Sequence, residues 1–304
     1  MEDKPLVSIV TLNYNQPDVT CEFLESTRRL TFNRFEIIVV DNGSETSSAE
    51  RIERQNYPNT KVIVSKENLG FAGGNNFGMC EAKGDYIFLL NNDTEVTPGL
   101  IESVLKPFYQ DKKVGVVSPK IKFYHSPDTI QYAGFERMNP YTGRSKMIGG
   151  KEVDYGQHDL PGETYGAHGA AMMIRRQVIE EVGMFAENFF LYYEEWDWST
   201  RIRRAGYKVF YQPEAVVYHK ESITVGKKST LKVYYQTRNR IFYMKRNTEN
   251  KQFIVFVLFF AILAVPKHVV NYLVLLQFRH LRAFLKGIAW NLKASAPPII
   301  SPSK

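Results

Sequence analysis

The sequence contains only two cysteines, Cys21 and Cys80, and lacks the CxxC spacing of a structural zinc site. Two isolated cysteines provide no disulfide framework, so we expect a reducing, cytoplasmic compartment. The N-terminal segment MEDKPLVSIVTLNYN has acids where a secretory signal peptide needs basic residues. We therefore expect no secretion signal at this end.

Two phosphate-binding fingerprints are also absent from the 304 residues. The sequence has no GxxxxGK[ST] loop and no GxGxxG motif. Its Gly-rich segment NLGFAGGNN, residues 68–76, follows the third expected strand rather than the first. These absences argue against a P-loop nucleotide-binding protein and against a nicotinamide dehydrogenase.

The longest apolar run, Phe253 to Val265, has thirteen residues, whereas a membrane span needs about twenty. Continuing it to Phe278 would place Lys267 near the bilayer centre, at a cost of about 2.5 to 3.5 kcal/mol. Basic residues flank both sides, which favours both ends being cytoplasmic. We expect two in-plane or re-entrant helices broken at Pro266; a true span, and a buried hairpin or dimer interface, are the alternatives.

The charge is divided unevenly along the chain. Residues 220–304 carry fifteen Lys or Arg and two acids, a charge of +13, which leaves −6 for residues 1–219. The bases flank an apolar stretch instead of alternating with aromatics, which favours an anionic membrane surface over nucleic acid. We predict a catalytic domain over 1–228 and a helical membrane-anchoring segment over 229–304, peripheral on the cytoplasmic face.

Apolar runs alternate with helix-period stretches through the first half, which predicts an α/β fold with a mostly parallel sheet flanked by helices. The expected strands are 6–12, 35–40, 61–64, 86–90 and 114–117. The expected helices are 17–30, 47–56, 73–82 and 98–109, followed by 194–205 and 231–246.

Polar residues end three of these strands, where ligands bind in parallel sheets. Asp93 follows the apolar run 86–90, and a carboxylate there suits a divalent cation that neutralises a diphosphate leaving group. Asp41, with Thr11 and Asn13, places hydrogen-bonding groups where a base and ribose could be read. An Asx turn or helix cap explains either aspartate equally simply.

Three acids, Glu194, Glu195 and Asp197, cluster at the start of an expected helix, where the helix dipole alone would stabilise them. Aromatic residues surround them, and apolar surroundings raise the basicity of a carboxylate that has to take a proton from a hydroxyl. His219 ends a later strand, and a single histidine is more often structural than a ligand. Catalysis and helix capping both remain open for the acids.

The segments VSIVTLNYN, IIVVDNGS, ENLGFAGGNN, YIFLLNND, GAHGAAMMIRR, FFLYYEEWDWSTRIRRAGY and VVYH occur in this order over residues 5–245. Together they resemble glycosyltransferase family 2, especially rhamnosyltransferase-like members that build lipid-linked surface polysaccharides. The resemblance implies a GT-A fold and an Mg²⁺ or Mn²⁺ cofactor. It also implies the following roles: metal at Asp93, Asn91 and His219; nucleotide at Thr11, Asn13, Asn15, Asp41, Asn68, Gly70 and Asn92; base at Glu195 with Glu194 and Asp197 supporting; acceptor at Gly169 and Ala170.

Two positions depart from the family pattern. NND replaces the fuller DxD motif and leaves one carboxylate at the metal position, so we expect a low metal affinity. Glutamate stands where many relatives carry aspartate as the base, which blurs the choice between Glu194 and Glu195.

The resemblance implies an inverting transfer of a sugar, with dTDP-L-rhamnose as first choice of donor and UDP-sugars as the alternative. A polyprenyl-diphosphate-linked saccharide is the expected acceptor, and Arg238 and Arg240 could meet its diphosphate, although a solvated basic helix face explains them equally. A sugar nucleotidyltransferase would need a basic Gly-rich loop after the first strand, which NYNQPD lacks. A non-catalytic sugar-nucleotide-binding scaffold and a homodimer remain possible; no nucleic acid partner is expected.

Overall fold

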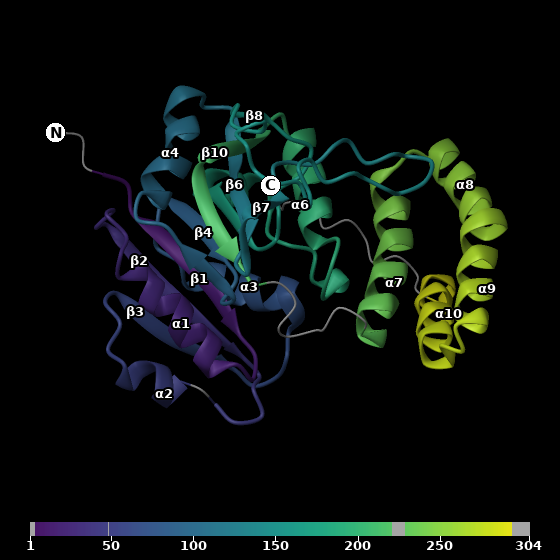
Figure 1. The fold of residues 1–304 in the computed structure, drawn as a ribbon, viewed down its shortest axis with the longest axis horizontal. Helices are drawn as coiled ribbons and strands as arrows, with labels where there is room; N and C mark the ends of the chain where they lie inside the picture. Colours follow the sequence, from purple (N-terminus) through teal and green to yellow (C-terminus); the bar gives the residue numbers. More distant parts are fainter. Residues whose placement is uncertain (1–3, 48, 221–228, 294–304) are drawn as a thin grey trace.

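The computed structural model describes residues 4–47, 49–220 and 229–293, and shows an α/β domain with a group of helices beside it (Figure 1). The strands are β1 (Val7–Asn13), β2 (Phe35–Asn42), β3 (Thr60–Ser65), β4 (Tyr86–Leu90), β5 (Thr94–Val96), β6 (Val114–Phe123), β7 (Ser126–Tyr132), β8 (Gly162–Glu163), β9 (Ala171–Arg175) and β10 (Lys208–His219). The helices are α1 (Pro17–Thr27), α2 (Ala49–Arg54), α3 (Gly70–Glu81), α4 (Leu100–Gln110), α5 (Arg176–Val182), α6 (Glu194–Arg204), α7 (Thr230–Asn247), α8 (Asn250–Phe259), α9 (Val265–Val274) and α10 (Phe278–Lys293), with a 3₁₀ turn η1 (Glu187–Phe189) and a π-helix η2 (Phe260–Ala264).

The sheet has the order β3-β2-β1-β4-β9-β6-β10-β5. The pairs β3–β2, β2–β1, β1–β4 and β6–β10 are parallel, and β9 and β5 run antiparallel to their neighbours. The predicted mostly parallel α/β fold is therefore confirmed. Strands β7 and β8 pair with β6 and β10.

Alternate residues of the central strands build two apolar layers, as the period of two in a strand requires. Ile9 and Ile37 face the layer that contains α1, α2 and α4. Val10 and Ile38 face the layer that contains α3, α5 and α6. Because helices cover both faces, these strands carry apolar residues on both faces, and their apolar runs are what predicted them as strands.

The apolar segment forms one continuous helical rod of 25 residues, Asn250–Val274, through α8, η2 and α9. The predicted break at Pro266 is therefore wrong. Pro266 lies in the first turn of α9, directly after the π-helix, where the wider turn accommodates a residue that has no N–H to donate. The chain turns instead at Leu276, whose φ is 53°.

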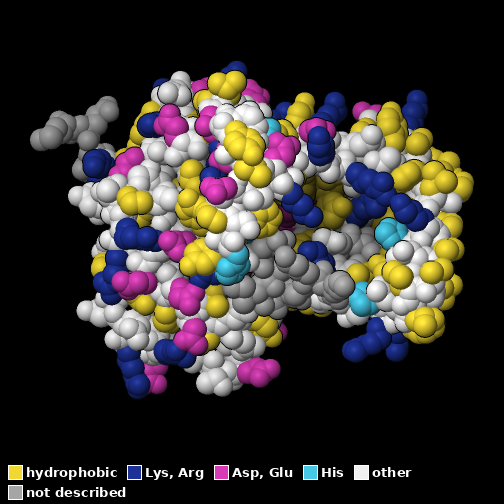
Figure 2. All heavy atoms as spheres, in the orientation of Figure 1, with side chains coloured by type: hydrophobic (Ala, Val, Ile, Leu, Met, Phe, Trp, Pro, Cys, Tyr) yellow, Lys and Arg dark blue, Asp and Glu magenta, His cyan; other side chains and the backbone are white. Residues whose placement is uncertain are grey.

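This rod is long and apolar enough, by length and composition, to cross a membrane, and only 17% of its apolar window is buried. Leu258, Ile262 and Leu263 expose more than half of their side chains. Helix α10 returns along α7, with Phe284 packed into the shared core. Figure 2 shows yellow apolar side chains spread over these C-terminal helices.

Candidate active site

The carboxyl ends of β1, β2 and β4 bring together polar residues that are far apart in sequence. Asn13 pairs with Asp41 in the β1–β2 register, and its amide donates to Asp41 Oδ1 at 3.3 Å. Thr20 donates to Asn13 Oδ1 at 2.9 Å and accepts from Asn92 Nδ2 at 2.9 Å. Ser47 donates to Asp41 Oδ2 at 3.1 Å. The expected nucleotide residues thus form one buried network that orients Asp41.

The other expected nucleotide residues surround this network. Thr11 Oγ1 is buried without a hydrogen-bond partner among the described residues. Asn15, at φ 54°, accepts from the Glu45 N–H through its side chain at 2.9 Å. Asn68 Oδ1 accepts from the Gly70 N–H at 2.8 Å, which fixes the start of α3.

Gly70 is required by its backbone and its surroundings. Its φ is +72°, and a Cβ would lie 2.4 Å from the carbonyl oxygen of Phe190. Phe71 N–H donates to the same oxygen at 2.6 Å. The Gly-rich turn is therefore joined directly to the loop before the acid pair, which is a connection the sequence did not indicate.

Asp93 and His219 lie against each other at the end of the sheet, with Asp93 Oδ1 3.1 Å from His219 Nε2. Both side chains are buried, and Asp93 Oδ1 lacks a properly oriented hydrogen bond among the described residues. His219 Nδ1 is 2.8 Å from Gln131 Oε1. An amide oxygen there favours the Nδ1–H tautomer, which turns the lone pair of Nε2 toward the carboxylate.

This geometry fits a divalent cation. Two ligand atoms at about 2.1 Å from an octahedral ion lie about 3.0 Å apart, which is close to the separation of Asp93 Oδ1 and His219 Nε2. In the described part of the chain no group of three or more His, Cys, Asp and Glu side chains could hold a metal. The remaining ligands of such an ion would come from a bound diphosphate and water, as is usual for Mg²⁺. Asn91, the third residue predicted at the metal, donates its backbone N–H to the Ala170 carbonyl at 2.9 Å.

His168 and Phe135 connect the Asp93–His219 pair with the acid pair. The His168 ring contacts His219 edge-on at 6.2 Å and stacks on Phe135 at 6.2 Å. Phe135 in turn contacts Trp196 at 4.8 Å. Burial lowers the pKa of His168 to about 3, and the nearby His219 adds to this, so His168 is neutral at pH 7.

The small residues Gly169 and Ala170 follow His168 directly. Ala170 N–H donates to His168 Nδ1 at 3.1 Å. The nearest atoms to a Cβ at Gly169 would be those of Phe71, at 3.6 Å or more. The expected acceptor residues therefore follow the histidine that contacts His219, and a Cβ at Gly169 would make only ordinary van der Waals contact with Phe71.

Glu194 and Glu195 begin α6. Glu194 is buried, and its Oε2 lacks a hydrogen-bond partner within the described residues. Burial raises the pKa of Glu194 well above its ordinary value, and the neighbouring Glu195 raises it further. Burial raises the pKa of Glu195 to about 7. A carboxylate of that pKa is matched to proton transfer near neutral pH.

Glu195 lines a cavity of about 340 Å³, a size that accepts a saccharide unit. Its walls are mainly aromatic and cationic: Phe135, Met138, Gly143, Arg144, Ser145, Tyr192, Tyr193, Trp196, Gln236 and Arg240. Phe135 and Trp196 form the wall toward His168. Asp93 and His219 do not line this cavity, and the chain of ring contacts through Phe135 and His168 lies between it and that pair.

The loop before the acids is strained and is clamped by α7. Phe190, Tyr192 and Tyr193 have φ values of 63°, 70° and 75°, which residues other than glycine rarely adopt. Buried Asn239 donates from Nδ2 to the carbonyls of Phe189, Leu191 and Tyr192 at 2.7 to 2.8 Å. Residues of α7 thus hold the backbone that aims Glu194 and Glu195.

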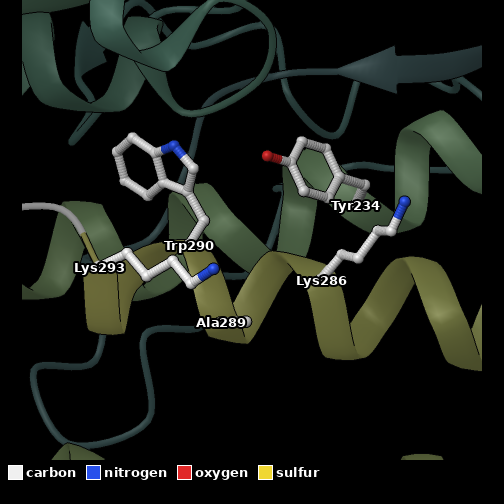
Figure 3. Close-up of a pocket in the computed structure, with 5 residues that line it drawn as sticks. All are labelled: Tyr234, Lys286, Ala289, Trp290 and Lys293. Atoms are coloured by element: carbon white, nitrogen blue, oxygen red, sulfur yellow. The ribbon is translucent and has the colours of Figure 1, made fainter.

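Arg238 belongs to the same clamp. It is buried and donates to the carbonyls of Asn188 and Phe189 at 2.5 and 2.6 Å. The Trp290 ring of α10 lies 4.5 Å from its guanidinium. Figure 3 shows Trp290 and Tyr234 beside a pocket of about 470 Å³ whose other lining residues are Lys286, Ala289 and Lys293. No carboxylate is among the described residues that line that pocket.

Asp197 does not line the cavity that contains Glu195. Its Oδ2 accepts from Arg201 at 2.9 Å, and its Oδ1 accepts from Arg246 and Asn247 at 2.8 Å. Both oxygens are used, and the side chain is fully buried. Asp197 therefore ties α6 to the end of α7, whereas Arg240 lines the cavity with Glu195.

Sequence reasoning missed His168, Gln131 and Asn239. His168 was visible in GAHGAAMMIRR, but a lone histidine gives no contact partner. Gln131 and Asn239 act through the atoms they orient, and only the pairing of β7 with β6 and of α7 with the 189–193 loop brings them there.

Residues 8–183, more than half of the chain, match the family described as Glycosyl transferase family 2. The chain belongs to this family. The likeness extends to relatives that cover most of it.

An L-rhamnosyltransferase of Mycobacterium tuberculosis, named N-acetylglucosaminyl-diphospho-decaprenol L-rhamnosyltransferase, is 25% identical over 73% of this chain and 78% of its own. The low-salt glycan biosynthesis hexosyltransferase Agl10 of Haloferax volcanii is 28% identical over 77% and 74%. An uncharacterised protein of Sinorhizobium fredii, y4gI, is 28% identical over 83% of this chain, which spans only 28% of that protein.

Two solved glycosyltransferase structures share the fold. GalNAc-T7 with UDP, GalNAc and Mn²⁺ superposes with a TM-score of 0.59 and 18% identity, over 79% of this chain and 50% of that one. The mannosyltransferase PcManGT of Pyrobaculum calidifontis with GDP-Man and Mn²⁺ gives 0.58 and 17%, over 98% and 78%. These structures show the GT-A fold, and the family match with its glycosyltransferase relatives shows a nucleotide-sugar glycosyltransferase. Both neighbouring structures contain Mn²⁺.

Proposed function

We propose that this glycosyltransferase inverts the anomeric centre of a nucleotide-bound sugar and transfers that sugar to a lipid-linked saccharide at the cytoplasmic face of a membrane. The observation that carries the proposal is the cavity that Glu195 lines, joined through Phe135 and His168 to the Asp93–His219 pair. The cavity provides a carboxylate of pKa about 7, and the neighbouring Asp93–His219 pair provides two ligand atoms spaced for a cation.

In this proposal Glu195 accepts the proton of an acceptor hydroxyl. The hydroxyl oxygen bonds to the anomeric carbon while the bond from that carbon to the diphosphate oxygen breaks. The nucleoside diphosphate leaves with the electron pair, and no covalent enzyme intermediate forms. Glu194 stays protonated beside Glu195, because its own burial and the neighbouring Glu195 charge both raise the pKa of Glu194.

Asp93 and His219 would hold Mg²⁺ or Mn²⁺, which supplies charge neutralisation at the departing diphosphate. The Asp41 network with Asn13 would read the pyrimidine and ribose, and Gly70 would let backbone approach the donor. Gly169 and Ala170 would leave room for the acceptor. Neutral His168 separates the cation from the acid pair without adding charge.

Donor and acceptor follow from the relatives. The mycobacterial relative is named for L-rhamnosyl transfer to a diphospho-decaprenol-linked sugar, which favours dTDP-L-rhamnose and a polyprenyl-diphosphate acceptor. A UDP-sugar is the second candidate, because the GalNAc-T7 structure contains UDP. The exposed apolar rod of α8–α9 supports acceptance of a lipid-linked substrate.

A thermal-shift screen of nucleotide sugars with and without Mn²⁺ tests the proposal, since a ligand that binds the folded state raises Tm. We expect a shift with a dTDP- or UDP-sugar that depends on Mn²⁺, and transfer by wild type but not by Glu195→Gln. Donor binding without transfer to any saccharide acceptor would favour a non-catalytic scaffold instead.

A further inference from the structure

Two arginines stand between the Glu195 cavity and the exposed apolar rod. Arg144 lies in the loop after β7, which reaches across to α7 and α8 (Figure 1), and Arg240 lies on α7. Both side chains line the cavity that contains Glu195. Arg144 also lies over the Phe259 ring at 5.9 Å, and Arg240 lies over the Phe260 ring at 5.4 Å.

These two guanidiniums lack an acidic partner. Among the described residues no carboxylate lies within 4 Å of either one, and Arg240 donates only to the Thr142 carbonyl. The pKa of Arg240 is lowered first by burial and also by the nearby charge of Arg144. Arg240 is half-buried and Arg144 is exposed, so an anion bound between the two guanidiniums would offset the desolvation of Arg240 and the repulsion between the two charges.

The surroundings indicate which anion fits. On one side lies the aromatic cavity with Glu195, and on the other side lies the α8–η2 surface. Val255 and Ile262, about one turn before and after Phe259, are 45% and 66% exposed. Figure 2 shows dark blue Lys and Arg side chains gathered beside the C-terminal helices, next to yellow apolar ones. The two arginines therefore lie between the Glu195 cavity and the apolar surface formed by Val255, Phe259 and Ile262.

We propose that Arg144 and Arg240 bind the diphosphate of an isoprenoid-diphosphate-linked acceptor, with its sugar in the Glu195 cavity and its isoprenoid chain along Val255, Phe259 and Ile262. Guanidinium groups suit phosphate oxygens because of their planar fork of donors. This inference rests on the proposed function and reassigns the diphosphate contact predicted for Arg238, which is buried and donates through Nη2 to backbone carbonyls.

Binding of farnesyl diphosphate to the full chain, measured by titration calorimetry in detergent, tests the site. We expect Arg144→Gln and Arg240→Gln each to weaken binding by about ten- to a hundredfold, as loss of a charge-assisted hydrogen bond does. Arg137→Gln is the matched control, because it removes the same charge from the same loop but lines a different cavity. We expect that variant to bind as wild type does.

Two further probes separate the sources of phosphate. Inorganic pyrophosphate and farnesol should each bind at least tenfold more weakly than farnesyl diphosphate, because each lacks half of the contacts. Unchanged farnesyl diphosphate affinity in Arg144→Gln, which alters an exposed side chain, would overturn the proposal. Equal weakening of farnesyl diphosphate binding in Arg137→Gln would also overturn it. So would a loss of binding to phosphatidylglycerol vesicles in Arg144→Gln or Arg240→Gln without a loss of farnesyl diphosphate binding. Either result would indicate a general anionic-lipid surface.

Donor binding distinguishes this inference from the proposed function. Arg144→Gln and Arg240→Gln should keep the Mn²⁺-dependent thermal shift with a nucleotide sugar, which also shows that they fold. If wild type binds farnesyl diphosphate through both arginines but no nucleotide sugar, the function is wrong and the site stands. If the donor binds and farnesyl diphosphate does not, the site is wrong and the function stands.

Discussion

Asn239→Ala removes one buried side-chain amide from α7 and should disturb the acid pair without touching it. Asn239 Nδ2 donates to the carbonyls of Phe189, Leu191 and Tyr192, in the loop that leads into Glu194. Alanine offers no donor, so the Leu191 and Tyr192 carbonyls lose this hydrogen bond, while the Phe189 carbonyl keeps the one from Arg238. The substitution therefore changes the contacts of α7 with the loop that positions Glu194 and Glu195, and not the acids themselves.

The magnitude follows from the hydrogen bonds and the backbone strain. Two amide hydrogens shared by three carbonyls contribute about 1 to 3 kcal/mol net, and buried carbonyls left unpaired add to the loss. Left-handed conformations at Phe190, Tyr192 and Tyr193 cost about 1 to 3 kcal/mol each, so the loop relaxes once the amide is gone. We expect the free energy of unfolding to fall by about 2 to 4 kcal/mol.

Turnover and its pH dependence report the position of the acids. In wild type the acidic limb of kcat/KM should have a midpoint near pH 7, because burial raises the pKa of Glu195 to about 7. A relaxed loop admits water to Glu195, which lowers this pKa toward its ordinary value and moves the midpoint down. Misplacement by about 1 Å should cost about a hundredfold in kcat.

Asn291→Ala is the control, because Asn291 Nδ2 also donates to backbone carbonyls, those of Arg238 and Gly287, but contacts no part of the loop. It should lower stability and leave the midpoint in place. A normal kcat and an unshifted midpoint in Asn239→Ala would refute the clamp. Equal shifts in both variants would show a general loss of packing instead.

Glu195→Gln should lose about 10² to 10⁴ in kcat and keep donor affinity by calorimetry; near-normal transfer would remove Glu195 as the base. The same variant should be more stable than wild type above pH 7 by about 3 kcal/mol and equal to it below pH 4.5, in urea titrations. The sign follows because the folded state holds the Glu195 proton up to about pH 7 whereas the unfolded chain releases it near 4.5, so wild type loses stability as pH rises through this window. Asp93→Asn should abolish the Mn²⁺-dependent part of donor binding, and a shift that survives would place the cation elsewhere. Ile262→Glu with Leu263→Glu should reduce partition into anionic vesicles without lowering Tm, because both side chains are exposed; full retention would separate the rod from membrane association.

The fold was largely predictable because its strands are buried on both faces. Strand β4 begins and ends where the apolar run YIFLL does, and α6 begins at Glu194 as expected. The antiparallel insertion of β9 between β4 and β6 was not predicted, since pairing partners leave no local pattern. Pro266 was misread because a π-helix before it absorbs the proline without ending the rod.

The candidate site was predictable where residues end strands and was not where residues act through others. Asp41, Asp93 and His219 were identifiable because each follows an apolar run. The network of Asn13, Thr20 and Asn92 depends on register and on the packing of α1, which residue order alone does not define. Arg238 was expected at a phosphate because exposed and buried arginines look the same in a sequence.

The charge division at residue 220 separates the chain chemically, but helix α7 joins its two parts mechanically. Asn239 holds the loop before the acids, while Arg246 and Asn247 hold Asp197 one turn into α6. The acid helix is therefore gripped at both ends of its first turn by one helix. The apolar rod begins at Asn250, directly after these contacts. Any restraint that fixes the rod therefore also limits how far the acid pair can move, which suits an enzyme whose acceptor hydroxyl must meet Glu195 at the edge of a lipid-facing surface.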